Sequence, residues 1–361
     1  MVLTVTANGE SYPVHIDEGG FAGLGASIRS RFPSLERVVC IVDGAVEAAH
    51  GAAIASGLRG MDAPMVSVVG GEGAKTIATW ERVVHSVLDC GVDRRTPIVA
   101  IGGGSVGDLA GFVAASVMRG VPLVQVPTTL LAMVDSSVGG KTGLNAPQGK
   151  NLIGAFHQPS LVHIALGALP TLPEPEYRSG LGEVVKHAVL GDRALFDFCN
   201  TQANAVGARD PAGVRYMVTA SVNLKAAIVA EDVREQGWRS VLNLGHTVGH
   251  AVETIQSRKQ RPIPHGMCVG MGLFAEVYWA EQRGECPAGT ARRVQDTLLK
   301  LGLPDRPEEF DINAALDAVK FDKKVRRGTL TTAVVEDVGR VRLASVSEDE
   351  FPAMFSAFED A

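Results

Sequence analysis

The chain has 361 residues, of which 46% are hydrophobic and 20% charged, and its formal net charge is -6. Its length exceeds that of one ordinary domain, so we expect two, and the composition is typical of a globular protein with a sizeable core. The negative charge, without any long Lys/Arg run, argues against a nucleic-acid-binding surface, so we expect small-molecule partners. There is no apolar run of about 18 residues and no signal-peptide pattern, which predicts a cytoplasmic protein without a membrane segment.

The first 160 or so residues alternate short β-branched runs with helical patterns. Strands are predicted at 38–42, 65–69, 97–101 and 123–126, with a helix at 78–88 among the segments between them. Such alternation indicates βαβ units around a largely parallel sheet. We therefore predict an α/β, Rossmann-like nucleotide-binding domain over residues 1–165.

The pattern changes near residues 158–171, after which long amphipathic stretches replace the strands. Helices are predicted at 174–190, 208–229, 245–255, 266–281 and 291–301, and a closing strand pair at 330–335 and 340–344. Residues 166–361 should therefore form a mainly α-helical metal- and substrate-binding domain. We expect the active site in the cleft between the two domains.

A glycine-rich turn, Ile101 to Asp108, follows a predicted strand and opens a helix predicted at 109–118. Glycines let the backbone approach a pyrophosphate, and a helix N-terminus offers it unpaired N–H groups. Asp43, Glu72 and Lys75 also follow strands and could contact the same cofactor. The glycine spacing departs from the G-x-G-x-x-G fingerprint, so this stretch could equally be a plain turn. Asp43, Glu72 and Lys75 could equally be solvated loop residues.

Cationic side chains stand in and around small-residue turns between residues 119 and 151. Lysines inside glycine-rich turns usually neutralise a phosphate or a carboxylate, which indicates an anionic substrate. Taken singly, each cation could also be an ordinary surface residue. Lys141 and Lys150 lie in these turns, and the same argument is extended to Lys225, Arg239, Lys323 and Lys324 elsewhere in the chain.

His246 and His250 are four residues apart in a segment that is predicted to be helical, so both rings can face one small volume. Such a pair alone is more often two ordinary histidines. Glu183, in an apolar helical stretch, and His265, at the start of another, complete the kind of ligand set that binds a catalytic zinc ion. We therefore predict a metal site. Asn243 precedes the pair and could orient a ligand.

These motifs carry a resemblance to the 3-dehydroquinate synthase family of the sugar phosphate cyclases. The most specific block runs from 102 to 159, and Gly182 to Lys186, Leu242 to Thr247 and His265-Gly266 follow in the family's order. The resemblance implies a homodimeric, NAD-dependent lyase with one divalent metal ion, zinc or cobalt. It would convert 3-deoxy-D-arabino-heptulosonate 7-phosphate, a phosphorylated keto-sugar acid, into 3-dehydroquinate and phosphate in the shikimate pathway. The implied steps are transient oxidation, phosphate elimination, re-reduction, ring opening and an internal aldol closure.

The resemblance also implies a role for individual residues. The metal ligands would be Glu183, His246 and His265. The catalytic residues would be Asp135, Lys141, Lys186, Asn243 and His250. The substrate would be bound by Arg119, Lys150, Asn151, Lys225, Arg239, Lys323 and Lys324. NAD would contact Asp43, Gly71, Glu72, Lys75, Gly103, Gly104, Ser105, Val106, Gly107, Asp108, Thr128, Thr129, Lys141, Lys150 and Thr171.

Two positions depart from the family's pattern. Met267 stands where an acidic residue is usual, and Gly182 replaces alanine, which is expected to loosen its helix slightly. Three other functions stay open: a cyclase that makes an inosose or a valiolone, a metal-dependent polyol dehydrogenase, and a non-catalytic NAD- or metal-binding regulator. The unbroken set of lysines and metal-ligand candidates favours the synthase.

Overall fold

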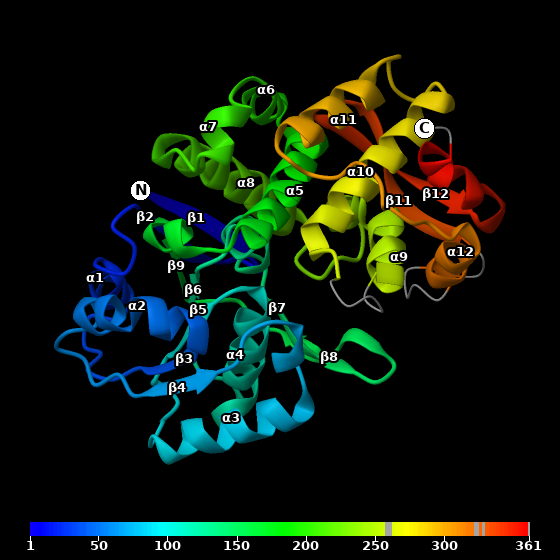
Figure 1. Ribbon diagram of the computed structural model, residues 1–361. Helices are drawn as coiled ribbons and strands as arrows, with labels where there is room; N and C mark the ends of the chain where they lie inside the picture. Colours follow the sequence, from blue (N-terminus) through cyan, green and yellow to red (C-terminus); the bar gives the residue numbers. More distant parts are fainter. Residues whose placement is uncertain (257–261, 321–324, 327–328, 360–361) are drawn as a thin grey trace. The chain divides into compact units, whose positions relative to one another are not determined.

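The computed structural model describes residues 1–256, 262–320, 325–326 and 329–359. Its contacts divide the chain into two compact units, shown in Figure 1. The first comprises Met1–Pro173 with Lys225–Val233, and the second comprises Glu174–Leu224 with Arg234–Ala361. The contacts thus group residues 166–173 with the first unit, whereas the sequence pattern placed the boundary between residues 165 and 166. The first unit is α/β and the second mainly helical, as predicted.

The first unit is built on a seven-stranded sheet in the order β1-β2-β9-β6-β5-β3-β4. All neighbouring strands are parallel except the edge pair β1 and β2. The strands are β1 (Val2–Ala7), β2 (Glu10–Asp17), β3 (Val39–Asp43), β4 (Met65–Val68), β5 (Ile98–Gly102), β6 (Leu123–Pro127) and β9 (Leu161–Ala165). The four predicted strands are confirmed and occupy its centre and one edge.

Helices cover both faces of this sheet, which explains why its central strands are apolar on both sides. Val39 and Ile41 of β3 pack in one core with α3 (Ile77–Asp89) and α4 (Gly104–Ser116). The alternate residues Cys40 and Val42 pack in the other core, with α1 (Leu24–Arg31) and α2 (Gly44–Gly57). Figure 1 shows α3 and α4 together beside the sheet.

Two hairpins and one inner strand were not predicted. Strand β1 turns into β2 through Asn8 and Gly9, both with positive φ, 54° and 78°, a two-residue turn that a search for Asn-Gly would have found. The second hairpin joins β7 (Lys141–Ala146) to β8 (Gly149–Phe156), in the segment interpreted only as anion-binding turns. Strand β9 is short, buried and without polar alternation, so its pattern was ambiguous.

The second unit contains the predicted long helices. They are α5 (Glu174–Gly191), α8 (Pro211–Glu231), α9 (His246–Gln256), α10 (His265–Gln282) and α11 (Thr290–Lys300). Three further helices were not predicted: α6 (Arg193–Thr201), α7 (Ala203–Gly207) and α12 (Ile312–Lys320). Helix α8 begins at Pro211 rather than at residue 208, because proline is suited to a first turn where its missing N–H is not needed. From Lys225 onwards, α8 is grouped with the first unit.

A small sheet and short helical turns complete the chain. Strands β10 (Val325–Arg326), β11 (Thr329–Asp337) and β12 (Arg340–Ser347) pair antiparallel, and β11 and β12 are the predicted closing pair. The 3-10 helices are η1 (Glu72–Ala74), η2 (Val117–Arg119), η4 (Leu166–Thr171), η5 (Trp238–Asn243), η6 (Glu348–Glu350) and η7 (Pro352–Phe358), and η3 (Ala132–Ser136) is a π-helix.

Glycines let three helices of the second unit approach backbone to backbone. A Cβ at Gly182 of α5 would lie 1.9 Å from the carbonyl oxygen of Gly266, and one at Gly266 would lie 1.9 Å from that of Ser179. A Cβ at Gly272 of α10 would lie 2.1 Å from the carbonyl oxygen of Gly245, which precedes α9. Gly182 therefore permits a close helix crossing, a role that the expectation of a slightly looser helix did not include.

Candidate functional site

Three histidine rings converge in the second unit, and two of them are the pair whose i, i+4 spacing predicted a shared volume. His246 and His250 lie one turn apart on α9, with ring centroids 5.1 Å apart, and His265 is the first residue of α10. The centroid of His265 lies 5.6 Å from that of His246 and 5.7 Å from that of His250. One nitrogen of each ring falls within 4.8 Å of the others, close enough to share one metal ion.

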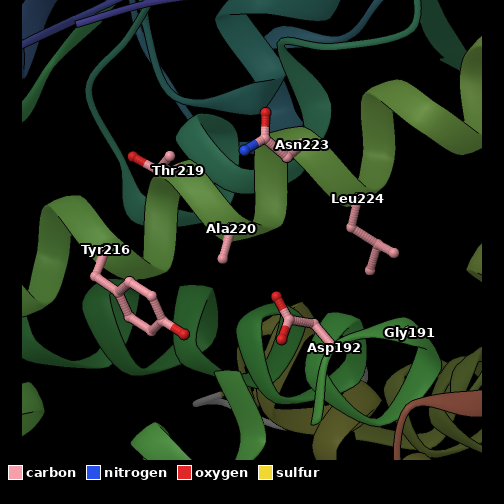
Figure 2. Close-up of a pocket in the computed structure, with 7 residues that line it drawn as sticks. All are labelled: Gly191, Asp192, Tyr216, Thr219, Ala220, Asn223 and Leu224. Carbon is pink, nitrogen blue, oxygen red and sulfur yellow. The ribbon is translucent and has the colours of Figure 1, made fainter. Parts of the chain in front are cut away.

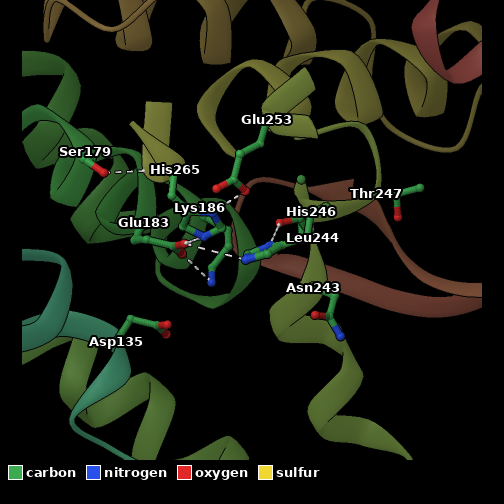
Figure 3. Close-up of polar contacts among 12 residues, drawn as sticks. Asp135, Ser179, Glu183, Lys186, Asn243, Leu244, His246, Thr247, Glu253 and His265 are labelled. Atoms are coloured by element: carbon green, nitrogen blue, oxygen red, sulfur yellow. Dashed lines mark hydrogen bonds and ion pairs between the residues drawn. The ribbon is translucent and has the colours of Figure 1, made fainter. Parts of the chain in front are cut away.

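Glu183 of α5 faces two of these rings (Figure 3). Its Oε1 atom lies 3.7 Å from Nε2 of His246 and 3.5 Å from Nε2 of His265. Its Oε2 atom lies 2.6 Å from Nζ of Lys186, one turn further along α5, and both side chains are only 1% exposed. The crossing at Gly182 and Gly266 produces this arrangement, because each glycine is the direct neighbour of Glu183 or His265.

Hydrogen bonds at Nδ1 fix the ring orientations of His246 and His265. Nδ1 of His246 lies 3.2 Å from the carbonyl oxygen of Leu244, which only accepts, so this nitrogen carries the proton and Nε2 is the nitrogen that can donate its lone pair to a metal. Nδ1 of His265 lies 3.0 Å from a carboxylate oxygen of Glu253. Both rings therefore turn Nε2 toward Glu183, in the pattern usual for metal-bound histidines.

Glu253 and Glu183 make this part of the second unit attractive to a cation. Desolvation lowers the pKa of His265, but hydrogen bonds to Glu183 and Glu253 outweigh it and raise the pKa to about 10. The sequence interpretation missed Glu253, although its spacing, three residues beyond His250 and seven beyond His246, places it on nearly the same helix face.

One carboxylate oxygen and imidazole nitrogens around one point are a donor set for zinc or a similar divalent ion. Glu183 and His265 therefore fit the predicted ligand role together with His246. The geometry also brings His250 into reach of the same point, so it does not separate a metal-bound His250 from one that faces the substrate.

Two further predicted residues of the second unit, Arg239 and Asn243, precede α9. Arg239 and Asn243 lie in η5, where Arg239 is 1% exposed. Nδ2 of Asn243 donates to Oε1 of Glu235 at 2.9 Å, a partner that sequence reasoning did not identify. The amide of Asn243 is thus held in one orientation, as a group that positions a ligand must be.

In the first unit, the predicted nucleotide-binding residues gather at the carboxyl ends of parallel strands. Asp43 ends β3, Gly102 ends β5 and pairs with Pro127 at the end of β6, and the N–H of Thr128 donates to the Gly102 carbonyl oxygen at 3.0 Å. A Cβ at Gly103 would lie 3.1 Å from Cγ2 of Thr129, so a side chain there would fit only if Thr129 shifted slightly. Nucleotides bind at this edge in open α/β sheets.

Helix α4 begins within the glycine-rich turn, at Gly104, and not at residue 109 as predicted. Ser105, Val106, Gly107 and Asp108 therefore belong to its first turns, and no side chain caps it in the described part of the chain. Its first N–H groups suit a diphosphate. Oγ of Ser105 accepts from the N–H of Gly71 at 3.1 Å, which brings two predicted cofactor residues together.

Lys75 organises a second group of predicted residues in the first unit. Its Nζ atom lies 2.7 Å from Oδ2 of Asp108, contacts Oδ1 of Asn151 and lies 3.8 Å from Glu72. Burial raises the pKa of Asp108, although Lys75 opposes this effect. Asn145, which was not predicted, joins the group by donating from Nδ2 to Glu72 at 2.7 Å.

Other predicted residues of the first unit lie on separate elements. Nζ of Lys225 lies 2.7 Å from Oδ1 of Asp135 and 2.6 Å from its carbonyl oxygen. Arg119 has a φ of 66°, a conformation that is rare for arginine and is often found at functional sites. Thr171 is hydrogen-bonded through Oγ1 to His50 at 2.7 Å.

Lys141 and Lys150, each exposed, belong to the β7–β8 hairpin. The predicted substrate residues Lys323 and Lys324 lie outside the described residues.

A surface pocket of about 460 Å³ opens elsewhere in the second unit (Figure 2). Tyr216, Asn223 and Leu224 of α8 and Asp192 are among its seven lining residues, none of which belongs to the predicted site. Among the described helices, none combines the length and hydropathy needed to cross a membrane.

The sequence and the fold both match known proteins. Models described as 3-dehydroquinate synthase N-terminal and C-terminal match residues 65–179 and 180–325. The 3-dehydroquinate synthase of Symbiobacterium thermophilum is 42% identical over 325 residues, covering 89% of this chain and 90% of that one. The 3-dehydroquinate synthase of Caulobacter vibrioides is 40% identical over 367 residues, covering 99% and 98%.

Two solved structures share the fold. One is 2-epi-5-epi-valiolone synthase from Streptomyces hygroscopicus subsp. jinggangensis 5008 with NAD+ and Zn2+ bound, at 27% identity and a TM-score of 0.86, covering 98% of each chain. The other is 2-deoxy-scyllo-inosose synthase complexed with carbaglucose-6-phosphate, NAD+ and Co2+, with a TM-score of 0.88. The two sequences are 24% identical, and the match covers 99% of this chain and 100% of that one, so it supports the fold alone. By sequence over nearly its whole length, the chain belongs to the 3-dehydroquinate synthase family.

Proposed function

We propose that this protein is an NAD- and metal-dependent carbon–oxygen lyase that converts 3-deoxy-D-arabino-heptulosonate 7-phosphate into 3-dehydroquinate and phosphate. The observation that carries the proposal is the convergence of Glu183, His246 and His265 in a chain of this family. The relatives named for this activity are 40–42% identical, against 27% for the valiolone synthase. The identities favour the dehydroquinate-forming reaction over the other cyclisations.

Glu183, His246 and His265 would hold a zinc or cobalt ion, whose chemistry is Lewis-acid polarisation of substrate oxygens. Lys186 keeps an ammonium 2.6 Å from Glu183, so it balances the carboxylate and offers N–H donors near the reacting oxygens. His250, one turn from His246, would move a proton at the substrate. Asn243, held by Glu235, would orient a substrate hydroxyl.

NAD would lie against the carboxyl edge of the first unit's sheet, and its chemistry is to accept a hydride and return it within one turnover. The diphosphate would meet the N-terminus of α4 at Gly104 and Ser105, and Asp43 would accept from a ribose hydroxyl. Bound NAD+ in the valiolone synthase of the same fold supports this assignment. Glu72, Lys75 and Asp108 would complete the cofactor site.

The substrate carries a carboxylate and a phosphate, so it needs cations. Lys225 and Arg239, each almost fully buried, and Arg119 would bind these anions. Low exposure strengthens such contacts because water screens them less. Their task is to hold the substrate and stabilise the departing phosphate. Asp135, Lys141, Lys150, Asn151, Lys323 and Lys324 are proposed as further contacts.

We also propose a cytoplasmic homodimer. Five free cysteines suit a reducing compartment, which supports the cytoplasm. The dimer is carried over from the family resemblance alone and is tested by light scattering of the purified protein.

The deciding experiment follows phosphate release from the heptulosonate phosphate by purified protein with NAD and Zn2+ or Co2+. We expect turnover that stops when either cofactor is omitted. Glucose 6-phosphate and sedoheptulose 7-phosphate are the control substrates. Phosphate release from one of them, and none from the heptulosonate, would replace this proposal with an inosose- or valiolone-forming cyclase.

A further inference from the structure

Glu276 lies in the middle of α10 and is 3% exposed, although its neighbours along the helix are apolar. Its carboxylate accepts hydrogen bonds from three backbone N–H groups at the start of α9. The Gly245 N–H donates to Oε2 at 2.8 Å, and the N–H groups of Thr247 and Val248 donate to Oε1 at 3.1 and 3.2 Å. A buried carboxylate on α10 therefore caps the start of α9, the helix that precedes it.

These hydrogen bonds satisfy backbone N–H groups at the start of α9. The first N–H groups of a helix have no partner within it, and the residue before α9 is Gly245, whose φ of 76° breaks the helical path and which has no side chain to cap it. A carboxylate satisfies several donors at once and its charge suits the positive end of the helix dipole. Bonds to a charged acceptor in a buried setting are the stronger kind of hydrogen bond.

The capped residues enclose His246. Gly245 and Thr247 are its chain neighbours, so its backbone is held on both sides by Glu276. Glu276 belongs to α10, whose first residue is His265. One side chain thus ties the backbone of His246 to the helix that carries another of the proposed ligands.

We propose that Glu276 is a positioning residue: it fixes the first turn of α9 so that His246 meets Glu183 and His265 in the geometry that a divalent metal ion requires. The inference rests on the metal site of the proposed function and adds a residue to it. Displacing a metal ligand by a fraction of an ångström weakens binding, so metal affinity should depend on Glu276.

Helix α10 supplies a matched control. Glu281 accepts from the N–H of Gly289 at 3.0 Å and from that of Ala291 at 2.7 Å, at the start of α11. It makes the same kind of contact from the same helix, but the segment it caps contains none of the proposed ligands. A cap that serves stability alone should behave alike at the two positions.

The experiment compares Glu276→Gln, Glu276→Ala and Glu281→Gln with the parent protein. The metal-free proteins are titrated with Zn2+ against a competing chelator, and Co2+ absorption reports the coordination geometry. Urea unfolding of each metal-free protein measures the cost of the lost cap.

We expect both glutamine variants to lose some stability, whereas only Glu276→Gln should weaken Zn2+ binding, by about 10-fold or more, and change the Co2+ spectrum. Glutamine is nearly isosteric and keeps one acceptor oxygen, so Glu276→Gln decides the matter even where Glu276→Ala fails to fold. Parent-like affinity and spectrum in Glu276→Gln would reduce Glu276 to an ordinary cap. A parent protein that binds no Zn2+ would overturn the metal site itself, and this inference with it.

Discussion

Glu253 holds His265 from the side opposite Glu183. A Glu253 oxygen lies 3.0 Å from Nδ1 of His265, while Nε2 of the same ring lies 3.5 Å from Glu183. A carboxylate behind a ligand histidine fixes the ring's tautomer and makes its other nitrogen a better donor. Contacts with a carboxylate on each ring nitrogen therefore fix the orientation of the His265 side chain.

Glu253→Gln should therefore weaken Zn2+ binding by about 10- to 100-fold while leaving the fold intact, because an amide can still accept from Nδ1 but carries no charge. Competition with a chelator measures the affinity, and circular dichroism checks the fold. Thr254→Ala, at the next residue on α9, is the control, since its hydroxyl donates to the backbone at His250. Equal affinities in all three proteins would contradict the role of Glu253.

The two histidines of α9 should differ in what they do. His246→Ala should abolish both activity and stoichiometric metal binding, because Nε2 of His246 faces Glu183 and its Nδ1 is committed to Leu244. His250→Ala should keep the metal and lose turnover. Metal content by atomic emission, read beside phosphate release, separates the two outcomes. A His250→Ala protein without metal would show that this ring is a ligand.

The spacing of His246 and His250 was sufficient to predict that their rings share one volume, because helix geometry is local. Glu183 was proposed as a ligand from its residue type and its apolar helical stretch, but the way it reaches the rings depends on a crossing of α5 and α10 that no local pattern predicts. The glycines that permit the crossing are visible in the sequence, but nothing local says which backbone each one meets. Glu276 was missed for the same reason: its partners lie about 30 positions earlier in the chain.

The first unit shows the same division. The strands ending at Asp43 and Gly102 were predicted from their apolar runs, and the sheet edge that they share follows from parallel pairing. The network around Lys75 was not predictable from its residues, since Asn151 reaches it through the β7–β8 hairpin. The glycine-rich stretch that forms this hairpin shows no clear alternation of apolar and polar residues, so its sequence is equally compatible with a loop and with a pair of strands.

The glycine crossing gives a sharp test of how the metal site is built. Gly266→Ala would place a methyl group 1.9 Å from the carbonyl oxygen of Ser179, so α10 must move away from α5. We expect a loss of about 1–3 kcal/mol in the free energy of unfolding and weaker metal binding, because His265 moves with the helix. Urea unfolding and a Zn2+ titration measure the two effects.

Gly270→Ala on the same helix is the control for that variant. Its added methyl group would lie 3.4 Å from Cδ2 of Leu298, an ordinary contact, so stability and metal affinity should stay near those of the parent. The crossing would have no part in forming the site if Gly266→Ala bound Zn2+ as tightly as Gly270→Ala does.

Lys225 should matter for substrate affinity. It is 5% exposed, and its ammonium already lies 2.7 Å from Asp135, so it is a fixed cation rather than a mobile one. Lys225→Ala should raise the KM for the heptulosonate phosphate by about 10-fold or more, the loss expected for one charged hydrogen bond. Lys300→Ala removes an exposed lysine as a control. An unchanged KM would remove Lys225 from the anion site.

His163 should make the first unit sensitive to acid. It is completely buried, and its Nε2 lies 2.9 Å from the carbonyl oxygen of Gly20, so this nitrogen carries the proton and Nδ1 accepts from Ser27 at 3.0 Å. Desolvation lowers the pKa of His163, and His15 lowers it further, whereas the Gly20 carbonyl and Asp17 oppose the shift. The folded unit therefore needs the neutral ring.

Because the folded pKa of His163 is below the ordinary value of 6.5, the unfolded chain binds more protons wherever the two states differ. Its contribution to stability is therefore complete above pH 6.5 and is lost progressively as the pH falls below that value toward the folded pKa. Urea unfolding of the parent protein, measured from about pH 7.5 down to about pH 5, should show this decline in the free energy of unfolding. His163→Asn removes the titrating group, so its stability should fall less steeply over the same range. Parallel curves for the two proteins would show that other groups cause the acid sensitivity, with His15, whose pKa is also lowered by burial, the next to replace.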